Sequence, residues 1–96
     1  MVNTLAVAYY RQGDLDRSQE AVEESIRLNQ GELPVDHFLL AMILHQRGKP
    51  EEAQRQFNHG LELIELQGLE DADPETEQFR DEAAALLESD PGAERP

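Results

Sequence analysis

The chain has 96 residues, and 21 acidic against 8 basic side chains give it a formal net charge of −13. The absence of cysteine excludes a disulfide framework, a cysteine-containing zinc site and a cysteine nucleophile. The negative charge argues against nucleic acid or a membrane surface as a partner, because both would repel it. With no apolar run long enough to span a bilayer, we expect one small, soluble, cytoplasmic domain.

Residues 1–31 show the pattern of two helices. Leu5 and Tyr9 lie four residues apart on one helical face, and Gly13 follows where a left-handed residue ends a helix. Asp14 or Asp16 is suited to cap the second helix. The apolar and small residues of that helix recur at helical spacing, at Ser18, Val22, Ser25, Ile26 and Asn29.

Residues 32–67 repeat this pattern. Leu40, Ala41 and Leu44 share a helical face, and Gly48 ends that helix. Pro50 is suited to the first turn of the next helix, with acidic residues beside it at the positive end of the helix dipole. The stripe of this fourth helix consists of Ala53, Phe57, Gly60, Leu61 and Ile64.

A third, more acidic segment follows. Asp73 and Pro74 form a helix start, with the aspartate as cap and the proline at the first helical position. One apolar stripe follows at Phe79, Ala83, Leu86 and Leu87. We predict a helix over residues 73–89 and a disordered tail over residues 90–96.

A shift of 35 residues aligns the first two units. Bulky residues meet bulky residues, small ones meet small ones, and Gly13 meets Gly48. The other aligned pairs are Leu5 with Leu40, Ala6 with Ala41, Tyr9 with Leu44, Ser18 with Ala53, Val22 with Phe57, Ser25 with Gly60, Ile26 with Leu61 and Leu28 with Leu63. Such self-similarity indicates a repeat architecture, in which the small residues let paired helices approach closely.

The aligned pattern resembles the tetratricopeptide repeat (TPR) family. The run from Leu5 to Asp16 carries the family's Leu-small-x-x-Tyr followed by Gly, and the run from Leu40 to Ala53 carries Leu-Ala, then Gly, then Ala. Val2 and His37 stand where the family has Trp. The resemblance implies an all-α, antiparallel helix-hairpin solenoid with units at 1–31 and 32–67, and it makes 73–89 a capping helix.

A second resemblance involves Phe38–Met42, Glu52-Ala53 and Phe79–Ala84. These runs are similar to the end of long TPR tails in some large bacterial Ser/Thr protein kinases. This resemblance implies an alternative function, as a regulatory or self-association segment of a larger multidomain signalling enzyme.

The sequence offers little to support catalysis or cofactor binding. Gly-x-Ser-x-Gly, a glycine-rich phosphate loop and His-Glu-x-x-His are all missing. His37 and His45 lie eight residues apart, about 12 Å along a helix, which is too far to share a metal ion. We therefore expect no enzyme, no cofactor and no metal site, and we expect His37 to be a half-buried structural residue.

The resemblance points instead to protein binding, since the first helix of each TPR unit lines a concave groove. The lining residues implied here are Val7, Tyr10, Arg11, Val35, Phe38, Leu39, Met42 and His45. Residues 38–44 are apolar nearly all round, so we expect Val7, Tyr10, Phe38 and Met42 to form an uncovered apolar strip. This strip favours a scaffold or adaptor function. Arg11 is the one basic residue there, so a partner's terminal carboxylate is not the expected ligand.

Three outcomes are open for this strip. It binds an apolar or amphipathic segment of another protein, it pairs with a second copy in a homodimer, or the capping helix over residues 74–88 packs close enough to cover part of it.

Overall fold

The computed structural model describes residues 4–31, 33–67 and 74–88, and within these residues the chain forms helices and no strands. The helices are α1 (Thr4–Gln12), α2 (Leu15–Leu28), α3 (Pro34–Gln46), α4 (Pro50–Gln67) and α5 (Pro74–Glu88). This confirms the predicted all-α helical repeat. The unit boundaries remain predictions, and the tail predicted at 90–96 lies outside the described residues. None of the described helices is long and apolar enough to cross a membrane.

The two helical hairpins turn in the same way, 35 residues apart. Gly13 and Gly48 have φ angles of 84° and 81°, as predicted for residues that end helices in the left-handed region. The amides of Gly13 and Asp14 bond to the carbonyls of Tyr10 and Tyr9 at 3.0 and 2.9 Å. After α3, the corresponding bonds run from Gly48 to His45 and from Lys49 to Leu44, at 3.1 and 2.9 Å. The shared turn geometry accounts for the repeated glycine.

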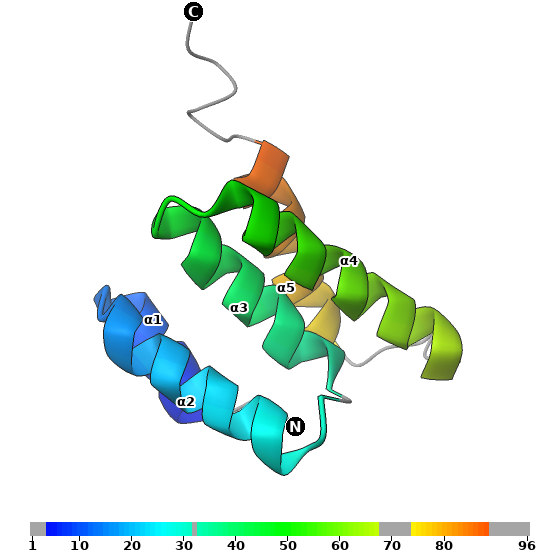
Figure 1. The fold of residues 1–96 in the computed structure, drawn as a ribbon, viewed down its shortest axis with the longest axis horizontal. Helices are drawn as coiled ribbons and strands as arrows, with labels where there is room; N and C mark the ends of the chain where they lie inside the picture. Colours follow the sequence, from blue (N-terminus) through cyan, green and yellow to red (C-terminus); the bar gives the residue numbers. More distant parts are fainter. Residues whose placement is uncertain (1–3, 32, 68–73, 89–96) are drawn as a thin grey trace, which may run out of the picture.

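The helices form two layers around α3. In Figure 1, α2, α3 and α4 lie side by side in front, while α1 and α5 lie behind them. Helix α3 packs against α2, α4 and α5, and its residues from Pro34 to Leu44 are all buried. A helix that is apolar nearly all round is expected in such a central position, because α2, α4 and α5 pack around it.

The small residues of the repeat lie where helices meet. Ala6, Ala41, Ser18 and Ala53 have no exposed surface, and the Ser18 hydroxyl donates to the carbonyl of Ala6 at 2.7 Å. Leu5 departs from the predicted pattern, since 56% of it is exposed. Its counterpart Leu40 lies on the central helix, whereas α1 packs mainly on α2 in the described fold.

Polar groups at the start of α3 form hydrogen bonds to α2 and contacts to α4. The Ser25 hydroxyl of α2 donates to the Asp36 carboxylate at 2.7 Å, and burial raises the pKa of this carboxyl group above its usual value. The ring of His37 lies 2.8 Å from the Gln56 side-chain oxygen and 3.0 Å from the Gly31 carbonyl oxygen. His37 is thus a structural residue, as predicted, and it is more deeply buried than expected, at 5% exposure.

Candidate functional site

A shallow hollow of about 300 Å³ lies where α1, α3 and α5 converge. Its lining consists of Tyr10, Met42, Glu82, Ala85 and Leu86. Apart from Glu82 and the hydroxyl of Tyr10, the side chains that line it are apolar. The Tyr10 hydroxyl accepts a hydrogen bond from the Gln46 side chain at 2.5 Å, which links α1 to the end of α3.

Arg11 joins α1 to α5 beside the hollow. Its guanidinium donates two hydrogen bonds to the Glu82 carboxylate, at 2.5 and 2.8 Å. The same guanidinium lies 5.6 Å from the ring centroids of both Tyr10 and Phe79, within the range of a cation–π contact. Since its two-pronged geometry matches a carboxylate, Arg11 links α1 to α5 through this ion pair.

The electrostatics of the site follow from this pair. The hydrogen bond from Arg11 lowers the pKa of the Glu82 carboxyl group below its usual value. Burial raises the pKa of the Tyr10 phenol, and the nearby Glu82 charge raises it further. At neutral pH the hollow therefore carries a neutral phenol and a neutralised ion pair, which suits an apolar ligand better than a charged one.

The structure corrects the predicted uncovered strip. Phe38 and Met42 have no exposed surface, and Val7 and Tyr10 are partly buried against the core. Helix α5 packs chiefly on α3, with its Phe79 and Ala83 buried, and so covers the face that was expected to be open. In this structure α5 covers part of the strip, which is the third of the outcomes that the sequence left open.

The predicted lining residues differ in burial. Val35, Phe38, Leu39 and Met42 are buried, while Val7, Tyr10 and His45 are partly buried and Arg11 is exposed. Of the predicted residues, Tyr10 and Met42 meet at the hollow. The binding role of all eight remains a prediction.

Sequence reasoning missed the contribution of α5. Glu82, Ala85 and Leu86 line the hollow, and none of them was expected to belong to the site. Leu86 was recognised as part of an apolar stripe, but the pattern does not say which surface that stripe covers. Arg11 and Glu82 are 71 positions apart, so no local pattern links them.

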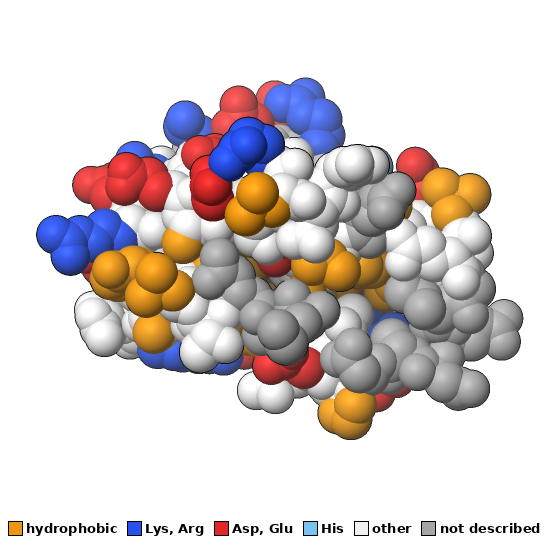
Figure 2. All heavy atoms as spheres, turned by 90° about the horizontal axis from the view of Figure 1, so that it is seen from below, with side chains coloured by type: hydrophobic (Ala, Val, Ile, Leu, Met, Phe, Trp, Pro, Cys, Tyr) orange, Lys and Arg blue, Asp and Glu red, His pale blue; other side chains and the backbone are white. Residues whose placement is uncertain are grey.

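Figure 2 shows one face of the molecule. On this face the hydrophobic side chains form separate patches, with acidic and basic side chains mixed along one edge. Scattered apolar residues are normal on a protein surface, so the converging lining of the hollow is the more specific feature.

The histidines do not assemble a metal site. The rings of His37 and His59 lie edge to face, with their centroids 4.5 Å apart, but both nitrogens of His37 already face oxygen atoms. In the described part of the chain, no three His, Asp or Glu side chains are grouped to hold a metal ion.

The Arg11–Glu82 pair predicts a pH-dependent contribution to stability. Because the folded-state pKa of Glu82 is lowered, the pair stabilises the fold above the unfolded pKa of about 4.3 and ceases to do so as the pH falls through the folded value. Glu82→Gln should lower the free energy of unfolding by at most about 1 kcal/mol at pH 7, since the pair is partly exposed. Urea unfolding of the wild type and the variant at pH 7 and pH 3 checks this prediction. If the two proteins differed in free energy of unfolding by the same amount at both pH values, the prediction would be contradicted.

The comparisons with known proteins agree with the fold. Two models of the tetratricopeptide repeat family match the chain, one over residues 2–38 and the other over residues 37–58. No curated protein and no solved structure matches it. The matches cover α1, α2 and α3 and the first half of α4, which include both turns with the shared glycine geometry. Through residues 2–58, more than half of its 96, the chain belongs to the tetratricopeptide repeat family.

Proposed function

We propose that this protein is a non-catalytic scaffold or adaptor that binds an apolar or amphipathic segment of another protein at the hollow between α1, α3 and α5. TPR repeats generally mediate protein–protein interaction, and the family is typically non-catalytic. The observation that carries the proposal is the convergence of three helices on one apolar-lined depression. Concave sites with apolar linings and few polar groups are the usual places where ligands dock.

The hollow suits one or two apolar side chains of a partner. The rim offers the Tyr10 hydroxyl and the exposed Arg11, which supply polar contacts around an apolar centre. This arrangement, an apolar centre with a polar rim, is typical of binding hot spots. Because the hollow is shallow, we expect a transient complex in which a bulky apolar residue of the partner packs against Tyr10 and Leu86, which line the hollow and are only partly buried.

Ala85→Arg tests this site. Ala85 is exposed and lines the hollow, so an arginine there fills the depression without entering the core. Partners are captured from the source organism by cross-linking, and the purified partner is then titrated against the wild type and the variant. We expect the variant to bind about tenfold more weakly, which corresponds to about 1.4 kcal/mol.

Ala8→Arg is the matched control, because Ala8 is also exposed on a helix but does not line the hollow. It should bind like the wild type. Light scattering over a range of concentrations shows whether a second copy is the ligand, in which case Ala85→Arg weakens self-association. Equal binding by the wild type and both variants would show that the hollow is not the docking site.

A further inference from the structure

A second surface lies on the other side of α3, in a furrow between α2 and α4. Two adjoining hollows of about 400 and 320 Å³ form it, and both are lined by Gln19 and Glu23 of α2. The second hollow reaches α4 through Glu52, Arg55 and Gln56. Figure 1 shows α2 and α4 flanking α3 on the side facing the viewer.

The floor of the furrow is a stripe along α3. Leu40 and Leu44 line the second hollow, and each keeps 7% of its surface exposed, whereas Phe38, Leu39 and Met42 keep none. None of Val35, Phe38, Leu39, Met42 and Ile43 keeps more than 3% of its surface exposed, so Leu40 and Leu44 retain the most exposed surface among these apolar residues of α3. Leu40 and Leu44 are one helical turn apart, a spacing that favours packing of side chains from another helix.

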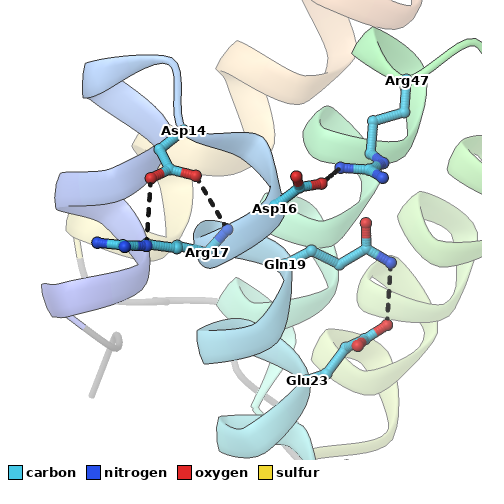
Figure 3. A network of polar contacts seen from close by, with 6 residues as sticks. All are labelled: Asp14, Asp16, Arg17, Gln19, Glu23 and Arg47. Atoms are coloured by element: carbon cyan, nitrogen blue, oxygen red, sulfur yellow. Dashed lines mark hydrogen bonds and ion pairs between the residues drawn. The ribbon is translucent and has the colours of Figure 1, made fainter.

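The two walls differ in charge. The α2 wall carries Asp16, Glu20 and Glu23. Figure 3 shows Asp16 joined to Arg47, and Gln19 beside Glu23 on the same side of α2. Asp16 is therefore neutralised, while Glu20 and Glu23 have no basic partner within the described ranges.

The opposite wall carries Lys49, which directly precedes α4, and Glu52 and Arg55 of α4. In the described part of the chain every other basic side chain forms an ion pair with a carboxylate, but Lys49 and Arg55 do not. In a protein with a net charge of −13, two basic side chains without an ion pair on one wall of a furrow are well placed to meet an acidic group of a partner.

We propose that this furrow is a second docking surface, which receives an amphipathic helix of a partner protein with apolar residues on one face, basic residues along one edge and acidic residues along the other. The apolar face packs on Leu40 and Leu44, the basic edge faces Glu20 and Glu23, and the acidic edge faces Lys49 and Arg55. The charge difference between the walls fixes the orientation of the helix, as charge complementarity does at protein interfaces. A helix fits better than an extended strand, because the backbone groups of α2, α3 and α4 are already bonded within their helices.

A selection experiment with the full chain tests this proposal. The probes are helical peptides with fixed leucines on one face and random residues along both edges, displayed and selected for binding. We expect enriched peptides to carry Arg or Lys along one edge and Asp or Glu along the other. Their binding should shift the methyl NMR signals of Leu40 and Leu44.

Charge reversal of one wall provides the second arm. Glu20→Lys combined with Glu23→Lys should weaken the binding of the selected peptides about fivefold or more. A new selection against this variant should favour peptides that carry acidic residues along the edge where the first peptides carried basic ones. The matched control is Glu62→Lys with Glu65→Lys, which makes the same charge change at exposed α4 positions outside the furrow. The control should retain most of the affinity.

The proposal would be overturned if the selection enriched no peptides or enriched peptides without an asymmetry between their edges. It would also be overturned if both charge-reversal variants lost the same affinity, or if light scattering showed a dimer that buries the furrow. Peptides whose binding is abolished by Ala85→Arg would bind at the hollow between α1, α3 and α5. The two surfaces are thus tested separately, and failure at one leaves the other standing.

Discussion

Serine in place of Phe38 or Met42 should unfold this protein rather than open a binding groove. Both side chains have no exposed surface. Removing a buried phenylalanine ring costs about 3–5 kcal/mol and a buried methionine about 2–5 kcal/mol, and the new hydroxyl adds the cost of a buried polar group. These losses are comparable with the whole stability of a small domain, which is roughly 5–15 kcal/mol.

Circular dichroism at 222 nm during urea titration measures this effect. Leu66→Ser is the matched control, because 77% of Leu66 is exposed, and it should leave the unfolding midpoint nearly unchanged. If Phe38→Ser and Met42→Ser retained the helicity and midpoint of the wild type, these residues would line an open surface and the described packing of α5 would be wrong.

Gly60→Ala should destabilise the protein by about 2 kcal/mol, even though alanine favours a helix over glycine by about 1 kcal/mol. A Cβ atom at this position would come within 2.7 Å of the Phe38 ring. That ring is fully buried and packs against the Phe57 ring, with the two centroids 5.4 Å apart, so it cannot move aside freely. The close approach explains why the repeat has its smallest residue at this point of α4.

A double-mutant cycle separates this clash from other effects of the alanine. In a Phe38→Leu background the smaller side chain leaves room, so Gly60→Ala should cost at least about 1 kcal/mol less than in the wild type. Urea unfolding of the four proteins gives the coupling energy. A coupling energy of zero would show that Phe38 does not oppose a side chain at position 60.

The hairpin geometry was visible in the sequence because it depends on short-range signals. Gly13 and Gly48 end helices in the left-handed region, and α4 begins at Pro50 as predicted. The 35-residue match also identified the small residues at helix contacts. The helix ends need only neighbours within one turn, and they therefore do not depend on how the units are arranged. The small residues were identified by the repeat itself, because they lie where two helices meet.

The candidate site was not visible in the same way, because it depends on where α5 lies. The sequence showed that α3 is apolar all round and that α5 has an apolar stripe, but it did not show that the two faces meet. The apolar circumference of α3 was interpreted as a partner surface, whereas it belongs to a central helix. The Arg11–Glu82 pair, which joins α1 to α5, is a long-range contact with no local signal.

Helix α5 covers α3, and the methyl group of Met42 reports on this packing directly. In a dilute sample labelled with ¹³C at methionine methyl groups, Met42 should show nuclear Overhauser contacts to Leu86, since both line the same hollow. It should also be protected from a soluble paramagnetic agent, since it has no exposed surface. A Met42 methyl without contacts to α5, and relaxed by the agent as strongly as free methionine, would contradict the account.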